Sequence, residues 1–251
     1  MSQQKKTMLI IMDGWGINRN PKSSAIEAAN TPFVDSLYLK YPNTGLLTHG
    51  EYVGLPEDQM GNSEVGHMNL GAGRVVFQDL MLINHKVKTG EIYQNKVVLD
   101  AFSYAKANHK KVHFIGLVSD GGIHSHTNHL KALIKCAKEN GVEQSFVHAF
   151  TDGRDTDPKS GLAFMEDLQQ YCSNTPTQIA SVCGRYFAMD RDKRWERIQL
   201  AYNLLVNGIG ENFSNVTEAI SSSYKNDVTD EFIKPIVIVD ENGQPLTTIE
   251  N

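Results

Sequence analysis

The sequence predicts an α/β fold with a mainly parallel sheet, because three strand-like segments alternate with three helical segments after residue 111. The strand-like segments are short and apolar, and the helical segments are bounded by proline or glycine. Short crossovers between parallel strands are nearly always right-handed, so the helices are expected on the faces of one sheet.

The N-terminal region is predicted to begin with a buried strand. Met8–Met12 is a continuous apolar run, typical of a strand covered on both faces, and it ends at Asp13. Thr31 and Pro32 provide an N-cap and a first helical residue for a helix that extends to about Tyr41. A second strand is expected at 45–48.

The next part of the chain has a different pattern. Residues 59–74 contain four glycines and no long apolar run, which indicates a loop dominated by its backbone, with a helical turn. Two mixed helical stretches are expected after this loop, at 75–89 and 96–108.

The regular part of the chain supplies the predicted sheet. Its strands are expected at 112–118, 145–150 and 177–183, with a further strand at 236–239 after Pro235. Its helices are expected at 126–140, 159–172 and 192–207. Gly141 and Gly208 are placed to end two of these helices, since glycine readily adopts the left-handed conformation that follows a helix.

Composition limits the class of protein. The 251 residues suit one large or two modest domains, and 40% hydrophobic residues suffice for a packed core. A net charge of -5 argues against a protein that coats nucleic acid or anionic membrane. Three cysteines without a CxxC pair, and no membrane-length apolar run, predict reduced thiols in a soluble cytoplasmic protein.

Chemically useful side chains follow the three predicted parallel strands. Open parallel sheets bind ligands at the carboxyl ends of their strands, so these residues are expected to share one rim. The candidates, in chain order, are Ser119, Asp120, His124, Asp152, Arg154, Asp155, Arg185, Asp190 and Arg191.

The arginines indicate what this rim binds. Five of the seven arginines lie between Arg154 and Arg197, and the planar guanidinium binds carboxylate or phosphate through paired hydrogen bonds. A small dianion is therefore the expected ligand. For Arg194 and Arg197 we favour the alternative of a solvated helix face paired with acidic neighbours.

A second candidate site lies around Ser63, within Gly61–His67. A serine flanked by glycines can expose its hydroxyl, and a helix starting there would offer N–H groups to a phosphate. Serine needs a base or a metal to act as a nucleophile. His67 could be the base, and the Asp13 carboxylate could hold a divalent cation beside Ser63. A glycine-rich loop with a serine is, however, often only a turn.

Two other ligand classes, metal ions and nucleotides, are less well supported by the sequence. His124 and His126 follow a predicted strand at a spacing that could bind a metal, but we favour anion binding by His124, with His129 an ordinary helix residue. The sequence contains neither a GxxxxGK[ST] loop nor a GxGxxG motif after a strand, so nucleotide binding is unsupported.

Five motifs together are far more specific than any one of them. In their order and spacing they resemble the 2,3-bisphosphoglycerate-independent phosphoglycerate mutases of the alkaline phosphatase superfamily. The motifs are Asp13–Gly16, Asn62–His67, Ser119–His126, Asp152–Asp155 and Gly184–Asp192.

The resemblance implies a discontinuous alkaline-phosphatase-like domain interrupted by an inserted α/β transferase domain. Residues 1–76 would be the first segment of the phosphatase-like domain, and residues 77–251 the substrate-binding domain, incomplete at its C-terminal end. Two Mn²⁺ ions, or Mg²⁺ in some members, activate the serine, and no 2,3-bisphosphoglycerate is required. The expected partner is a small molecule, phosphoglycerate, with no nucleic acid, no membrane and a monomeric full-length chain.

The same resemblance assigns roles to residues. Ser63 would carry the phosphoryl group in the interconversion of 3- and 2-phosphoglycerate, and Asp13 and Ser63 would bind one metal ion. His124, Arg154, Arg185 and Arg191 would hold phosphoglycerate. Asp155 would be both a substrate contact and a candidate acid or base for its hydroxyl.

The chain departs from the family pattern by ending at Asn251, before most of the expected metal ligands. Two oxygen donors are too few for a tight two-metal site, so we expect these 251 residues alone to be inactive. Residues 1–76 would also lack much of their sheet and expose apolar surface. The alternatives are a non-catalytic phosphoglycerate-binding fragment and a metal-dependent phosphatase or phosphopentomutase-like enzyme.

Overall fold

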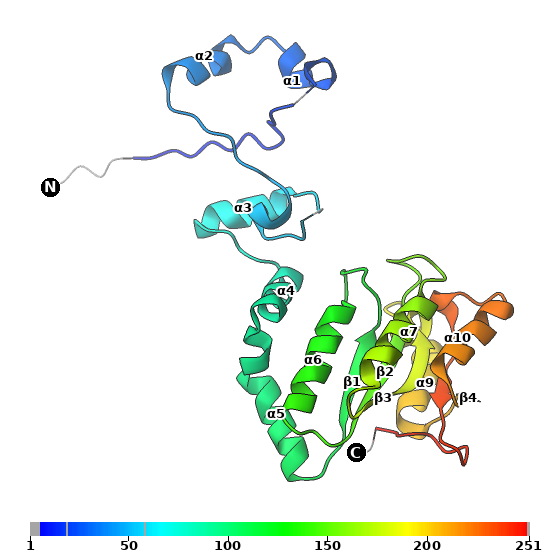
Figure 1. Ribbon diagram of the computed structural model, residues 1–251. Coiled ribbons are helices and arrows are strands. Elements are labelled where there is room, and N and C mark those ends of the chain that lie inside the picture. The colour runs from blue at the N-terminus through cyan, green and yellow to red at the C-terminus, as the bar shows by residue number, and fades with distance from the viewer. Residues whose placement is uncertain (1–5, 19, 58, 250–251) are drawn as a thin grey trace. The chain divides into compact units, whose positions relative to one another are not determined.

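The computed structural model of the chain describes residues 6–18, 20–57 and 59–249 (Figure 1). The chain divides into two compact units, residues 1–78 and residues 79–251. Among the residues described, no helix combines the length and apolarity needed to cross a membrane.

The second unit is built on a five-stranded sheet with the strand order β1-β2-β3-β5-β4. The strands are β1 (Val112–Leu117), β2 (Ser145–Thr151), β3 (Thr177–Gly184), β4 (Glu211–Phe213) and β5 (Ile236–Ile238). β1, β2 and β3 pair in parallel, β5 pairs antiparallel with β3, and β4 pairs in parallel with β5. The predicted α/β fold with a mainly parallel sheet is confirmed.

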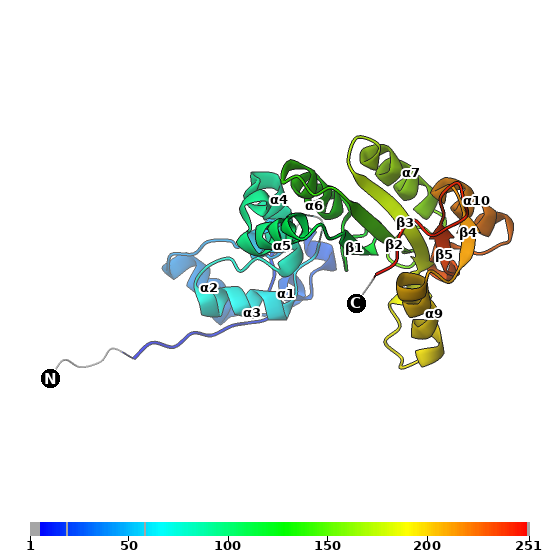
Figure 2. The same ribbon diagram turned by 90° about the horizontal axis from the view of Figure 1, so that it is seen from below.

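Helices cover both faces of this sheet, as Figure 2 shows for α6 and α7 on one face and α9 on the other. The helical elements of the unit are α4 (Asp79–Thr89), η3 (Glu91–Gln94), α5 (Lys96–Ala107), α6 (Thr127–Glu139), α7 (Gly161–Cys172), α8 (Arg185–Ala188), α9 (Trp195–Asn207), α10 (Val216–Lys225) and η4 (Asp230–Phe232). The larger core packs α6, α7 and α10 on the sheet through fully buried residues such as Ile134, Met165 and Ile220. A smaller core packs α9 on the opposite face.

The elements of the second unit that the sequence analysis did not predict include β4, α8 and α10. The structure also starts α9 at Trp195 rather than at residue 192. The Asp190 carboxylate accepts the backbone N–H of Arg194 at 2.8 Å, and Lys193 has a φ of +60°, so the turn before α9 is not helical. The glycine stops are confirmed, since Gly141 and Gly208 both have positive φ after α6 and α9.

The three cysteines are free and buried, two on helices and one on β3. Burial raises the pKa of Cys172 to about 11 and that of Cys183 to about 12. These thiols are therefore packing groups rather than nucleophiles.

The first unit contains short helices and a small core. Its elements are η1 (Pro21–Ser23), α1 (Ala25–Ala28), α2 (Pro32–Lys40), η2 (Gly50–Val53) and α3 (Ser63–Ala72). The predicted helix after Thr31 is confirmed as α2. The core cluster consists of Val53, Leu55 and Val65, so little apolar burial stabilises this unit.

Two predictions for the first unit are wrong. Residues 8–12 and 45–48 form no strand, and the side chains of Met8, Leu9 and Ile10 are 82%, 74% and 73% exposed. The described part of this unit contains no strand with which they could pair, and an unpaired strand leaves its backbone polar groups without partners.

The loop predicted at 59–74 is largely a helix, α3. Its start is determined by Asn62, whose side chain accepts the backbone N–H of Val65 at 3.0 Å. Gly73 ends it with a φ of +64°.

Candidate functional site

The carboxyl ends of β1, β2 and β3 bring together a buried network of charged side chains. Asp152, directly after β2, is 3% exposed, and Arg185, directly after β3, is 6% exposed. Nη1 of Arg185 donates to Oδ1 of Asp152 at 2.6 Å and to Oδ2 of Asp155 at 2.5 Å. From the end of β1, the Ser119 hydroxyl donates to Oδ2 of Asp152 at 2.7 Å.

This network is stably ionised. Burial opposes the charge on Asp152, but backbone N–H groups of Asp155 and Arg154, the Ser119 hydroxyl and Arg185 together lower the pKa of Asp152. Burial likewise opposes the charge on Arg185, yet its two carboxylate partners raise the pKa of that guanidinium. The Asp152–Arg185 ion pair therefore persists at neutral pH.

His124 belongs to the same rim. Its Nε2 lies 3.7 Å from Oδ2 of Asp155, and its side chain is 40% exposed. The predicted rim residues His124, Asp155 and Arg185 are thus in direct or near contact, and Asp155 connects the other two.

Arg154 lies at this rim but is held by a different acid. Its Nε donates to Oε1 of Glu231 at 3.0 Å, and its Nη2 donates to the same oxygen. The side chain of Arg154 remains 53% exposed, whereas that of Glu231 is 14% exposed. Arg154 and Arg185 are therefore both already paired with carboxylates, and an anionic ligand has to share or displace these partners.

The remaining arginines are separate from this network. Arg191 is exposed after α8, and within the described residues its side chain makes no hydrogen bond or ion pair. Arg197 donates to Oδ1 of Asp190 at 3.0 Å and lies 3.9 Å from the Tyr186 ring centroid. The interpretation of Arg197 as a helix residue paired with acidic neighbours is supported by these contacts.

The Ser63 site is formed within the first unit. Ser63 is the first residue of α3, and its hydroxyl donates to Oδ2 of Asp13 at 2.6 Å. Both side chains are exposed, and Gly14 after Asp13 has a φ of +78°. A Cβ at Gly61 would lie 1.7 Å from the Thr48 carbonyl oxygen, so only glycine permits this loop to pass so close to residue 48.

His67 does not contact the serine hydroxyl. Its Nδ1 lies 2.7 Å from the backbone oxygen of Ser63, one helical turn earlier. The Ser63 hydroxyl is therefore paired with a carboxylate and not with an imidazole, and His67 is not positioned as its general base.

Comparison with known proteins identifies the family. Residues 83–251 match the family model for the N-terminus of BPG-independent phosphoglycerate mutase. The chain belongs to this family. It is 61% identical over 245 residues to the 2,3-bisphosphoglycerate-independent phosphoglycerate mutase of Flavobacterium johnsoniae, and 49% identical over 249 residues to that of Clostridium kluyveri.

These matches cover 98% and 99% of this chain but 48% and 49% of the two mutases, so the chain spans about half the length of the curated relatives it matches. A crystal structure of Leishmania mexicana phosphoglycerate mutase at low cobalt concentration aligns with a TM-score of 0.70 and 37% identity. That alignment covers 90% of this chain and 43% of the other.

The oxygen atoms of the Ser63 site are candidate ligands for a divalent metal ion. Oδ2 of Asp13 and Oγ of Ser63 are two exposed oxygen donors that suit one hard divalent cation. Within the described residues, no group of three or more His, Cys, Asp or Glu side chains could hold a metal ion. Asp13 and Ser63 therefore suit part of a ligand set, which the described residues do not complete.

The histidines considered as metal ligands, His124 and His126, and the nearby His129 belong to no group of three or more potential metal ligands within the described residues. Nδ1 of His126 accepts the backbone N–H of Asn128 at 3.1 Å as a helix cap, and Nε2 of His129 lies 2.5 Å from Oδ1 of Asn84. Burial and the nearby His126 lower the pKa of His129. The rings of His126 and His129 thus have structural partners.

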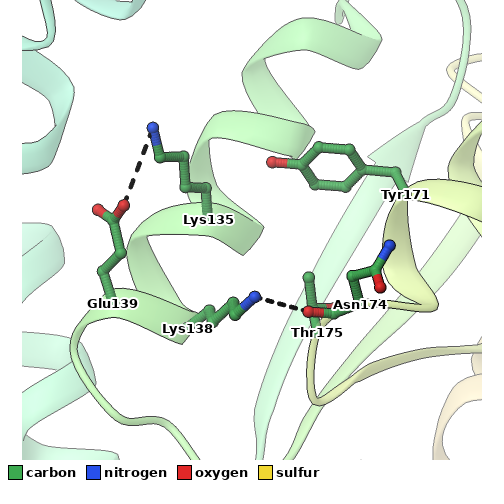
Figure 3. A pocket seen from close by; sticks show the side chains of 6 residues that line it. All are labelled: Lys135, Lys138, Glu139, Tyr171, Asn174 and Thr175. Carbon is green, nitrogen blue, oxygen red and sulfur yellow. Dashed lines mark hydrogen bonds and ion pairs between the residues drawn. The ribbon is translucent and has the colours of Figure 1, made fainter.

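A cavity of about 340 Å³ lies between the C-terminal ends of α6 and α7 (Figure 3). Lys138 donates to the Asn174 carbonyl at 2.7 Å, and Lys135 lies 3.8 Å from Glu139. The Tyr171 hydroxyl donates to the Lys131 carbonyl at 3.0 Å. Lys135, Lys138 and Tyr171 therefore already have partners within the protein, and the cavity is not part of the rim.

Sequence reasoning missed Glu231. It lies just before β5, and β5 runs antiparallel to β3, so the start of β5 meets the carboxyl ends of β2 and β3. No local motif marks this residue. Only the direction of β5 could have indicated that Glu231 reaches Arg154.

Proposed function

We propose that this chain supplies the phosphoryl-accepting serine and part of the substrate site of a phosphoglycerate mutase that interconverts 3- and 2-phosphoglycerate without 2,3-bisphosphoglycerate. The observation that carries the proposal is the 2.6 Å hydrogen bond from the Ser63 hydroxyl to the Asp13 carboxylate at the start of α3. A hydroxyl at a helix N-terminus, beside a hard carboxylate, is a favourable place to receive a phosphoryl group.

Each part of the chain has a role in this proposal. Residues 1–76 are the first segment of the phosphatase-like domain, and residues 77–251 are the inserted substrate-binding domain. Asp13 and Ser63 would hold one of two divalent ions, Mn²⁺ or Mg²⁺, which when bound stabilises the serine alkoxide. We place the enzyme in the cytoplasm, where glycolysis supplies its substrate.

The rim residues retain glycerate while the phosphoryl group is on Ser63. His124, Arg154, Arg185 and Arg191 bind its anionic groups, and Asp155 exchanges a proton with its hydroxyl. The Asp155 carboxylate lies within 3.7 Å of His124 and 2.5 Å of Arg185, so binding and proton transfer would be coupled at one group.

The 251-residue chain alone is expected to show no turnover with Mn²⁺ and 3-phosphoglycerate, because its described residues offer too few metal ligands. A chimera tests the positive claim, with this chain replacing the matching half of the Flavobacterium johnsoniae relative. The chimera should be active, Ser63→Ala should reduce its turnover by roughly 10³-fold or more, and the control Ser36→Ala should have no effect. An active Ser63→Ala chimera would contradict the proposal.

The phosphatase alternative is tested with the same chimera. If water rather than glycerate accepted the phosphoryl group, inorganic phosphate would be released and His124→Ala would leave the rate unchanged. We expect no phosphate release and a loss of mutase activity in His124→Ala.

A further inference from the structure

Residues 229–233 lie directly on the carboxyl ends of β2 and β3. The backbone N–H of Gly184 donates to the Ile233 carbonyl at 2.7 Å. A Cβ at Gly184 would lie 2.4 Å from the Glu231 carbonyl oxygen, and a Cβ at Gly153 would lie 2.8 Å from the Glu231 nitrogen. Glycines at both strand ends therefore let this segment approach the rim more closely than any side chain would permit.

Asp230 fixes this segment in place. Its fully buried carboxylate accepts the backbone N–H of Gly161 at 2.7 Å and the Tyr224 hydroxyl. Its carbonyl accepts the Thr151 hydroxyl at 2.7 Å. Ser160 provides no side-chain cap for α7, so Asp230 serves as the cap from a distant part of the chain.

Glu231 projects from this fixed backbone toward Arg154. Oε1 of Glu231 accepts hydrogen bonds from Nε and Nη2 of Arg154, which lie on one side of the planar guanidinium group. A guanidinium has five N–H donors, so the Nη1 end remains for a second acceptor. An exposed arginine without such a partner samples many rotamers and loses that freedom when it binds a ligand.

We propose that Glu231 is a positioning residue that holds the Arg154 guanidinium in one orientation, with its Nη1 end ready for an anionic group of phosphoglycerate. The inference rests on the proposed function, in which Arg154 binds that substrate. A carboxylate beside an arginine can also compete with the anionic ligand for the guanidinium. Positioning by Glu231 raises the affinity for the ligand, whereas competition lowers it.

Calorimetric titration of the 251-residue chain with 3-phosphoglycerate separates these effects. Glu231→Ala should weaken binding about tenfold, whereas Glu231→Gln, which keeps an oxygen acceptor for Arg154, should recover most of that affinity. The exposed Glu241 provides the matched control, and Glu241→Ala should leave binding unchanged. Tighter binding by both Glu231 variants would show competition and overturn the inference.

A measurement without ligand distinguishes this inference from the proposed function. In the ¹H–¹⁵N spectrum of the free chain, the Nε–H of Arg154 should exchange slowly with water in the wild type and in Glu231→Gln, and rapidly in Glu231→Ala. Equal exchange in wild type and Glu231→Ala would overturn the positioning role. A wild-type chain with a slow Nε–H but no affinity for phosphoglycerate would instead count against the proposed substrate site.

Discussion

Two short apolar runs of this chain differ in burial and in secondary structure. Met8–Met12 is five apolar residues long and is exposed throughout, with Ile10 at 73%. Ile236–Ile238 is three residues long and is buried, with Ile236 at 2%. The longer run forms no strand, and the shorter run is a strand of the sheet.

The difference lies in their neighbours. β5 has hydrogen-bonding partners on both sides, β3 and β4, and helices pack on the sheet that contains it. In the described part of residues 1–78 there is no strand beside 8–12. An apolar run therefore predicts a strand only where other segments can satisfy its backbone and cover its side chains.

The largest expected effect comes from truncating one isoleucine in each run. Ile236→Ala should lower the free energy of unfolding of residues 79–251 by about 2–5 kcal/mol, because it leaves a cavity in a closed core. Ile10→Ala should change stability by less than about 0.5 kcal/mol, because its side chain is already exposed. Urea unfolding followed by far-UV circular dichroism measures both, and a comparable loss for Ile10→Ala would show that residues 8–12 are buried in solution.

Acid should destabilise the two regions unequally. Burial and the neighbouring His113 lower the pKa of His148 on β2 to about 4, and its two ring nitrogens contact His113 and Ser181 at 2.9 and 2.7 Å. The unfolded chain binds this proton near pH 6.5 and the folded chain near pH 4, so stability falls as the pH decreases through that window, by up to about 3 kcal/mol. In the first unit, the side chains of His49 and His67 are exposed.

Hydrogen exchange at several pH values measures this difference by region. Amides of β2 should lose protection between pH 6.5 and 4, and His148→Gln should remove that part of the pH dependence even if it lowers stability overall. Protection of β2 with the same pH dependence in wild type and His148→Gln would contradict the assignment to His148.

The smallest effect compares two asparagine caps. Asn62 caps α3 through the N–H of Val65, and Asn215 caps α10 through the N–H groups of Thr217 and Glu218. Replacement by alanine should cost about 1 kcal/mol in each case. Because Val216, Ala219 and Ile220 of α10 are part of the buried core, Asn215→Ala should lower the cooperative unfolding transition, whereas Asn62→Ala should only speed amide exchange within α3.

The placement of the rim residues could be predicted from the sequence, but their pairing could not. The rule for open parallel sheets correctly brought His124, Asp155 and Arg185 to one rim, because the positions of β1, β2 and β3 follow from local patterns. It did not indicate that these charges pair with one another. Asp152 and Glu231 neutralise Arg185 and Arg154 through contacts between residues 33 and 77 positions apart.

The sequence by itself determined the α/β class, the parallel core of the sheet, the glycine helix stops and the family motifs, since each depends on neighbouring residues or on a fixed short spacing. Only the tertiary structure decided that residues 8–12 form no strand, that β5 runs antiparallel, and that Glu231 reaches Arg154. Strand pairing and ion pairing across long sequence separations depend on which segments meet in the folded chain. Local composition does not specify these partners.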